Sequence, residues 1–190
     1  MEYIINWLKE NLSEERFLHS IGTRDAAEKL AIMFGLDSQK AALAGLLHDC
    51  AKEYSYEDML EIISEHCPDV DEEELKAKKV LHAPVSAYVA KTIFDVQDAE
   101  ILDAIRFHTI GRIGMTDFEK VIFLADKIEL NTRIEENFEA LRKELDTTKS
   151  LDSTLFLCSK MTIQSLLDRN LIINNKTIEL YNYLLNLLKK

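Results

Sequence analysis

The chain contains very few residues that reverse its direction, with only five glycines and two prolines among 190 residues. A sheet-rich fold needs many tight turns, which these two residue types form most readily. No segment shows the alternation of apolar and polar residues that is typical of a strand. The sequence therefore predicts an all-α protein built from long helices with short connections.

Apolar residues recur at helical spacing along most of the chain, and capping residues precede several of these segments. Ser13, followed by two glutamates, predicts the start of a helix that Gly35 ends. We expect helices at about 14–34, 39–49, 56–65, 84–94, 98–108, 117–129, 150–169 and 177–188. The charged segment 69–79 is expected to form a short exposed helix. With no linker or repeat, residues 1–190 are predicted to form one domain, which helices 150–188 complete.

The formal net charge of −11 limits the classes of partner. An acidic surface repels the phosphates of DNA and RNA, which argues against a nucleic-acid partner. A small anionic substrate remains compatible with this charge, because a bound divalent cation reverses the local potential at a site.

The three cysteines, Cys50, Cys67 and Cys158, are odd in number and far apart. This spacing predicts neither a disulfide framework nor a cysteine zinc site, and we expect reduced thiols in helix cores. No segment resembles a signal peptide or has the length of a membrane span. We therefore expect a cytoplasmic location with no membrane partner, while the oligomeric state is left open.

The dipeptide His48-Asp49 lies near the end of an expected helix that has a face of small residues. At 100° per residue, His48 shares this face with Ala41, Ala44 and Gly45. Small side chains let neighbouring helices approach closely and leave room for a metal ion. Asp49 diverges from His48 by about one-third of a turn, which suits a carboxylate that bridges two ions.

Further ionisable residues lie on or beside apolar helix faces. His19 and His108 fall on apolar stripes, and His82 starts a helix where its side chain can turn into a cleft. Asp126 borders another stripe, and burying an unpaired carboxylate is costly. Imidazole and carboxylate ligands suit Fe, Mn, Zn or Co, and more than four such groups suggest two ions. Taken singly, each histidine is more often a core residue, and Asp126 could pair with a surface lysine. His66 is expected to be exposed.

These residues occur in segments that resemble a known family. A histidine, a His-Asp pair, two spaced histidines and an aspartate form the pattern of HD-domain metal phosphohydrolases. The match is closer still to the YqeK-like symmetrical diadenosine tetraphosphate hydrolases of bacteria. The matching segments are RFLHSIGTRDAA (16–27), GLLHDCAK (45–52), LHAPVSAYVA (81–90), FHTIGRIGM (107–115) and FLADKIELNTR (123–133). Cys50 and Leu130-Asn131 depart from the usual pattern of the group, which bears on substrate contacts and not on metal ligands.

The resemblance implies an HD-domain-like helical bundle whose metal-site core covers about residues 16–133. It implies that one ion is held by His19, His48, Asp49 and Asp126. It implies a second ion held by His82 and His108, with Asp49 shared. Iron is the metal implied, although Mn, Co or Zn would suit the same ligands. The implied reaction is cleavage of diadenosine tetraphosphate into two ADP.

Positive groups close to these ligands are candidates for binding a polyphosphate. Lys52 follows His48 by one helical turn and is the first candidate, both for binding and, with Asp49, for catalysis. Arg16 is a weaker candidate, because long charged side chains usually belong to the solvated face. An exposed lysine at a helix end is the plain alternative for Lys52.

The loop after His108 supplies a second group of candidates. Arg112 could bind phosphate, and Thr109 and the Gly111 backbone could donate hydrogen bonds to it, as glycine-rich loops do. Tyr88 could stack on a base. The plain alternatives are an ordinary turn between helices and an aromatic residue of the core or surface.

Three other functions compete with this hypothesis. A different HD-type phosphohydrolase, acting on a nucleoside mono- or triphosphate or on an alarmone, would have the same ligands. A nucleotide-binding regulatory module with a vestigial site, or a helical scaffold with no site, would not need all six ligand types.

Overall fold

The all-α prediction is confirmed in the computed structural model, which describes residues 1–189 and has no strand among them. The helices are α1 (Glu2–Asn11), α2 (Glu14–Met33), α3 (Ser38–Leu47), α4 (Tyr56–His66), α5 (Glu72–Lys76), α6 (His82–Thr92), α7 (Ala99–Phe107), α8 (Asp117–Ile128), α9 (Glu136–Thr148), α10 (Leu151–Asp168) and α11 (Asn175–Leu188). A short 3₁₀ turn, Lys78–Val80, precedes α6.

Several helices begin at the capping residues that the sequence indicates. The Asp37 side chain accepts hydrogen bonds from the backbone N–H groups of the first turn of α3. Thr116 and Glu119 form a reciprocal capping box at the start of α8. Ser13 stands at the N-cap of α2, but its side chain makes no capping hydrogen bond. Gly35 ends that helix with a φ of +69°, in the left-handed region.

Two helices, α1 and α9, were not expected from the sequence. Helix α1 has only Leu8 among its buried residues, and the buried residues of α9 are Leu141 and Leu145. Most other positions of α9 are polar or charged, so its apolar stripe is narrow although it keeps the helical spacing. Helix α1 packs on the core through Ile4, Ile5, Trp7 and Leu8, and α9 through Leu141 and Leu145.

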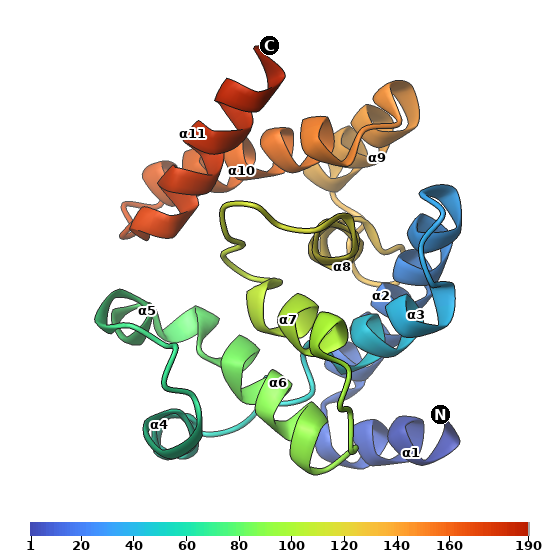
Figure 1. Cartoon of the computed structure of the whole chain (residues 1–190), viewed down its shortest axis with the longest axis vertical. Helices are drawn as coiled ribbons and strands as arrows, with labels where there is room; N and C mark the ends of the chain where they lie inside the picture. The colour runs from blue at the N-terminus through green and yellow to red at the C-terminus, as the bar shows by residue number, and fades with distance from the viewer. Residues whose placement is uncertain (190) are drawn as a thin grey trace.

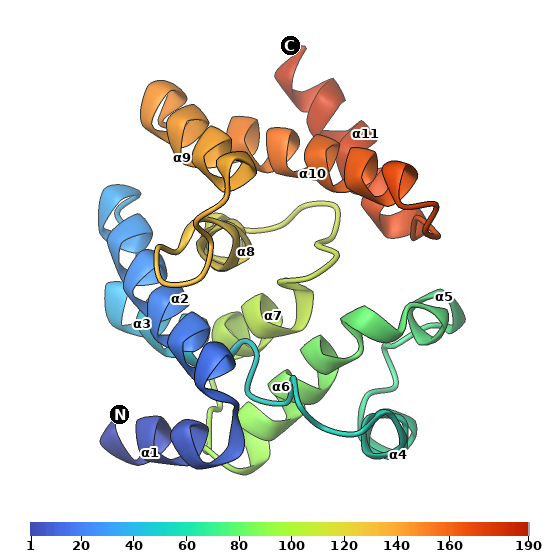
Figure 2. The same cartoon turned by 180° about the vertical axis from the view of Figure 1, so that it is seen from behind.

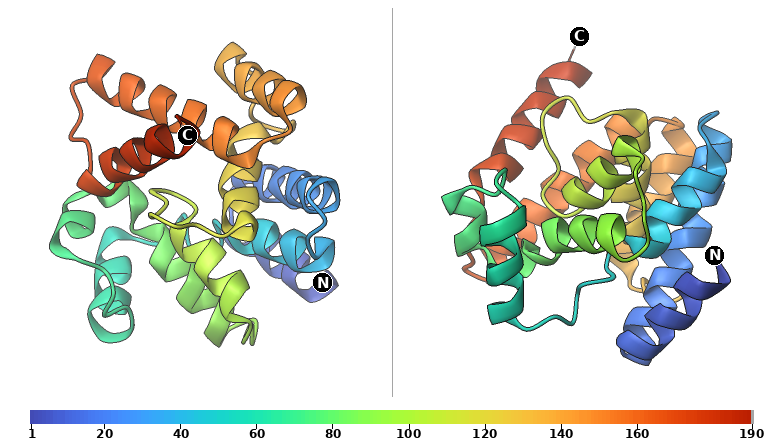
Figure 3. Two further views of the ribbon diagram at one scale, coloured as in Figure 1. Left: turned by 45° about the horizontal axis from the view of Figure 1, so that its top comes forward. Right: turned by 60° about the horizontal axis from the view of Figure 1, so that its bottom comes forward.

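The helices that carry the candidate ligands surround the centre of the molecule. Helix α2 packs against α3 and α8, and α6 packs against α7. Figure 1 shows α8 end-on in the middle, with α6 and α7 below it and α9, α10 and α11 above. The reverse view in Figure 2 shows α2 passing in front of α3. Helices α10 and α11 pack as a pair, which is followed best in Figure 3.

The close packing of α2 on α3 follows from the small-residue face of α3. Ala41 and Ala44 are fully buried. A Cβ atom at Gly45 would lie 2.8 Å from the backbone oxygen of Thr23 in α2. The predicted close approach of helices at this face is therefore confirmed.

The expectation of a solvated helix in segment 69–79 is wrong at Glu74. This residue of α5 is 0% exposed. Its carboxylate lies 2.8 Å from Nη2 of Arg106 in α7 and also contacts Nζ of Lys176 in α11. Two cations from distant parts of the chain thus compensate the burial of Glu74, which a local charge pattern does not reveal.

Two smaller expectations can be compared with the structure. All three cysteines are buried and free, as predicted. Among the helices of residues 1–189, none combines the length and apolar character needed to cross a membrane.

Candidate metal centre

The six predicted ligands come from five helices or their ends and are all buried. His19 lies within α2, His82 begins α6, and Asp126 belongs to the last turns of α8. His48 and His108 are the C-cap residues of α3 and α7, and Asp49 follows His48 directly. The structure brings all six side chains together.

One half of the cluster is formed around His19 and His48. Their Nε2 atoms lie 3.2 Å apart. Asp126 Oδ1 lies 3.0 Å from His19 Nε2 and 4.0 Å from His48 Nε2. Asp49 Oδ2 lies 3.9 Å and 3.7 Å from the same two nitrogens. Four donor atoms thus face one small volume.

The other half is formed around His82 and His108. Their Nε2 atoms also lie 3.2 Å apart. Asp49 Oδ1 lies 2.9 Å from His82 Nε2 and 3.4 Å from His108 Nε2. The two oxygens of Asp49 therefore face different pairs of imidazoles.

The tautomers of two histidines follow from their backbone contacts. His48 Nδ1 lies 2.7 Å from the carbonyl oxygen of Gly45, and His108 Nδ1 lies 2.7 Å from that of Ile105. Because a carbonyl only accepts, each Nδ1 donates its proton and leaves a lone pair on Nε2. These lone pairs point into the cluster, as metal-binding imidazoles require.

Other atoms of the cluster also fit a cation. Oδ1 of Asp49 is buried and accepts no hydrogen bond of normal geometry. The ligand atoms of His19, His48 and Asp126 lie within 4.8 Å of one another, as do those of His48, Asp49 and His108. Inward lone pairs and a buried unsatisfied carboxylate oxygen form a donor set that a divalent metal ion satisfies.

Electrostatics hold most of the cluster in its metal-binding protonation state. Burial lowers the pKa of His48 to about 3, and burial lowers that of His82 to about 4. Burial opposes ionisation of Asp49, but the surrounding histidines hold its pKa well below the usual value. Burial also opposes ionisation of Asp126, whose pKa is held low by Lys127 and by a hydrogen bond with His19. Neutral imidazoles and ionised carboxylates are the forms that bind metals.

Lys52 and Arg16 lie beside the cluster. Lys52 Nζ is 2.9 Å from His82 Nε2 and 3.6 Å from Asp49 Oδ1. Burial lowers the pKa of Lys52, and Asp49 opposes this shift. Arg16 Nη1 lies 3.8 Å from Asp49 Oδ2. The Arg16 and Lys52 side chains are 33% and 26% exposed, so both reach from the cluster towards solvent.

Tyr88 and Arg112 lie apart from the six ligands, in a cavity of about 560 Å³ that none of those ligands lines. The Tyr88 ring stacks on the exposed ring of His66, with centroids 4.5 Å apart. The Arg112 guanidinium lies 3.1 Å from Asp103 and 2.8 Å from the buried Glu119. The cavity runs along α6 and α7, the helices that carry His82 and His108.

The loop after His108 has a structural role of its own. Gly111 adopts a φ of +67°, and a Cβ atom there would lie 2.6 Å from Leu180 Cδ2 of α11. The Thr109 hydroxyl is buried without a hydrogen-bond partner. Glycine is therefore required at position 111 by the backbone turn and by the packing of α11.

Several residues that contact the cluster were not predicted from the sequence, among them Arg133 and Glu129. Arg133 Nη2 lies 3.1 Å from Asp126 Oδ1, the oxygen that also faces His19 Nε2. Glu129 is buried, and its Oε1 lies 3.2 Å from His19 Nδ1. Both belong to the segment 123–133 that carries Asp126, and an acidic residue just beyond an apolar helix is the signal that would have indicated Glu129.

The matching family model gives the class of the protein. The HD domain model matches residues 16–131, a range that contains all six candidate ligands. The chain belongs to the HD domain family.

Curated relatives narrow this assignment. The chain is 39% identical to the symmetrical bis(5'-nucleosyl)-tetraphosphatase of Bacillus subtilis, over 94% of each chain. It is 36% identical to the enzyme of the same name from Staphylococcus aureus, over 92% of this chain and 89% of that protein. Identity at this level over nearly the whole length places the chain in the same family as these two proteins.

A solved structure shares the whole fold. It is described as a predicted HD superfamily hydrolase involved in NAD metabolism from Clostridium acetobutylicum. The TM-score is 0.92 at 35% identity, and the match covers 97% of this chain and 96% of that one. The C-terminal helices beyond residue 131 therefore belong to the shared fold.

Proposed function

We propose that this protein hydrolyses diadenosine tetraphosphate symmetrically to two ADP, with two divalent metal ions in the cluster. The observation that carries the proposal is the position of Asp49, whose two oxygens face two separate pairs of imidazoles. The names of the curated relatives supply the substrate and the symmetrical cleavage. Iron is the metal we expect, and Mn, Co or Zn would suit the same ligands.

The ligands divide into two sets in this proposal. One ion is held by His19, His48, Asp49 and Asp126, and the other by His82, His108 and Asp49. When bound, such a pair of ions supplies a water nucleophile at neutral pH and neutralises charge on the phosphoryl group. The histidines hold Nε2 lone pairs inward, and Asp49 fixes the separation between the two sets.

Lys52 and Arg16 are proposed to bind the polyphosphate next to the point of cleavage. Both are cationic groups within 4 Å of Asp49 and partly open to solvent. An ammonium in this position stabilises negative charge that develops on the phosphate oxygens. We assign Lys52 a role in catalysis and Arg16 a role in binding.

The cavity along α6 and α7 is the proposed place for a more distant part of the substrate. Tyr88 presents an aromatic face there, and Arg112 a cation. Thr109 and the Gly111 backbone remain candidate donors, but the Gly111 turn is already explained by its packing against Leu180. The whole chain, residues 1–190, is proposed to act as one domain.

Product analysis in ¹⁸O-labelled water tests the reaction. The iron-loaded protein should convert diadenosine tetraphosphate into two ADP, with one ¹⁸O atom in one of each pair. Formation of ATP and AMP would show asymmetrical cleavage, and a lack of any ADP would refute the proposed substrate.

A second candidate is another HD-type nucleotide phosphohydrolase. The Clostridium acetobutylicum structure is described as a hydrolase involved in NAD metabolism, so nicotinamide-containing nucleotides are further candidate substrates. Steady-state kinetics with diadenosine tetraphosphate, NAD, nucleoside mono- and triphosphates and alarmones distinguish the two candidates, because the preferred substrate has the highest kcat/KM.

A further inference from the structure

Glu129 is a buried carboxylate beside the cluster but is not one of the six proposed ligands. It is 1% exposed and follows the last residue of α8. Its oxygens accept hydrogen bonds from the backbone N–H of Asn131 at 2.6 Å and of Thr132 at 3.0 Å. The Thr132 hydroxyl donates to the same carboxylate. A turn of the backbone thus compensates the burial of this charge.

The contact between Glu129 and His19 determines the roles of the two ring nitrogens. His19 Nδ1 lies 3.2 Å from Glu129 Oε1, whereas Nε2 faces Asp126 and His48 inside the cluster. When a metal ion is bound at Nε2, the single ring proton of His19 is on Nδ1. Glu129 Oε1 and the Thr132 hydroxyl each lie 3.2 Å from Nδ1, and the carboxylate is the stronger acceptor of this proton. A carboxylate behind a metal-binding imidazole orients the ring and raises its basicity.

His19 needs this partner because of its place in the helix. His48 and His108 stand at helix C-termini, where carbonyl oxygens of the last turn lack helical partners, and each donates to one of them. His19 lies in the second turn of α2, where the nearby carbonyls are already used by the helix. Its Nδ1 proton must therefore be accepted by a side chain from elsewhere.

Gly22 provides the space for that side chain. It lies one turn after His19 in α2 and has no positive φ that would require glycine. A Cβ atom at Gly22 would lie 2.2 Å from Glu129 Oε2. Glycine within a helix costs about 1 kcal/mol relative to alanine. Here it is explained by the position of the carboxylate.

We propose that Glu129 is a positioning residue that holds His19 in its metal-binding orientation, and that Gly22 provides the space it occupies. Asn131 ties the same turn to α2, since its Nδ2 donates to the Leu18 carbonyl at 3.0 Å. The inference rests on the metal centre proposed above, but it concerns a residue that does not bind the metal.

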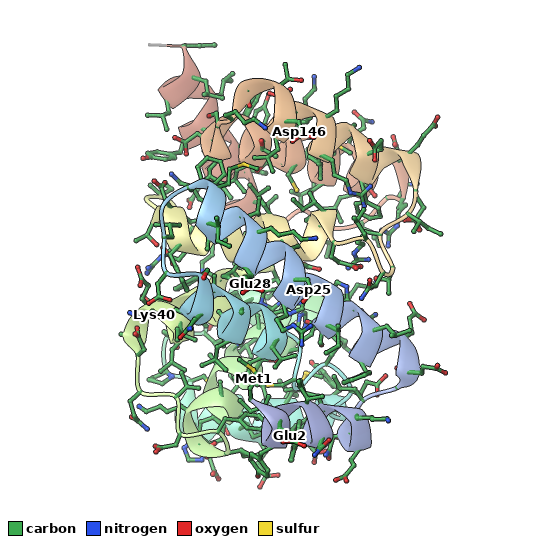
Figure 4. The ribbon with its side chains drawn as sticks, turned by 90° about the vertical axis from the view of Figure 1, so that its right-hand side faces the viewer. Met1, Glu2, Asp25, Glu28, Lys40 and Asp146 are labelled. Atoms are coloured by element: carbon green, nitrogen blue, oxygen red, sulfur yellow. The ribbon has the colours of Figure 1, made fainter. Side chains whose placement is uncertain are left out.

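Binding of Mn²⁺ to metal-free protein, followed by the electron paramagnetic resonance of the free ion, tests the first part. Glu129→Gln should weaken Mn²⁺ binding about 10- to 100-fold, the usual effect of removing such a partner. In a His19→Ala background the same substitution should have little further effect, because Glu129 acts through His19. Glu28→Gln, an exposed carboxylate on the outer face of α2 in Figure 4, serves as the control and should bind as wild type.

The Nδ1 proton signals of the Zn²⁺-loaded protein provide a readout independent of activity. In wild-type protein the Nδ1 protons of His19, His48 and His108 should all be protected from exchange. Glu129→Ala should remove protection at His19 alone, because the other two protons are held by backbone carbonyls. The loss should be complete when Thr132→Val also removes the hydroxyl that lies 3.2 Å from His19 Nδ1. Gly22→Ala should reproduce this selective loss if the variant folds, as judged by circular dichroism.

The outcomes separate the two proposals. Wild-type Mn²⁺ affinity and a protected His19 proton in both Glu129 variants would overturn the positioning role, provided that His19→Ala loses metal. Full metal binding by His19→Ala would overturn the metal centre itself, and the role of Glu129 with it.

Discussion

Asp49 contacts His82 directly, with Oδ1 of the carboxylate 2.9 Å from Nε2 of the imidazole, while Oδ2 faces the opposite half of the cluster. A carboxylate in this position serves both proposed ions, whereas His82 serves one. Asp49→Ala should therefore lose both metal ions, and His82→Ala should lose mainly one. Metal analysis of freshly purified variants measures this, with His66→Ala as the control. Equal losses in the two variants would count against bridging by Asp49.

Removal of the metal should lower the stability of the folded protein. An ion that binds only the native state adds about 2.7 kcal/mol when its free concentration is 100 times Kd. Scanning calorimetry should show a lower Tm for the wild-type protein after chelation. The Tm of Asp49→Ala should not respond to the chelator, and an equal response in both proteins would contradict the proposed centre.

Replacement of Lys52 should impair catalysis without emptying the cluster. Lys52→Met removes the ammonium 3.6 Å from Asp49 Oδ1, and loss of one such stabilising group lowers kcat about 100-fold or more. Metal content should be retained. Lys29→Met, which removes an exposed lysine of α2, is the control and should keep wild-type kinetics. An unchanged kcat for Lys52→Met would leave the residue without a catalytic role.

The buried Glu74 should contribute strongly to stability. Glu74→Gln leaves the Arg106 guanidinium without its buried partner, and breaking such a pair costs about 3 kcal/mol or more. Urea unfolding at fixed metal concentration gives the change in the free energy of unfolding. Glu72→Gln changes an exposed carboxylate of the same helix and should shift it by less than about 0.5 kcal/mol. Similar values for the two variants would mean that the burial of Glu74 has no energetic consequence.

The contact between Asp71 and Lys176 should make stability depend on pH. A hydrogen bond from Lys176, 2.6 Å away, lowers the pKa of Asp71. A carboxyl with a lowered folded pKa stabilises the protein above its unfolded pKa, about 3.9, and this contribution is lost as the pH falls through the folded pKa. Asp71→Asn leaves the contact of Lys176 with Glu74 in place, and the difference in unfolding free energy between wild type and this variant should therefore shrink between pH 6 and pH 3. If this difference in unfolding free energy stays constant over that pH range, the contact between Asp71 and Lys176 is not a source of pH-dependent stability.

Much of the fold could be predicted because helix formation depends on local sequence. The starts of α3 and α8 follow from Asp37 and Thr116, whose side chains cap the helices on which they stand. The inward faces of His19 and His108 follow from the helical period. Helices α1 and α9 were not predicted, although their apolar residues recur at helical spacing. A short helix with few apolar residues is stable only when it packs on the rest of the fold, which the local pattern does not show.

The sequence by itself determined that the chain is helical and that His19 and His108 lie on inward faces, and its resemblance to a known family indicated the set of six ligands. The tertiary structure decided that the oxygens of Asp49 face separate pairs of imidazoles, that Glu129 stands behind His19, and that Glu74 is buried. It also placed Tyr88 and Arg112 in a cavity apart from the ligands. The physical reason is that local periodicity fixes the face of a helix on which a side chain lies. The distance between two such faces depends on how helices far apart in the sequence cross and pack.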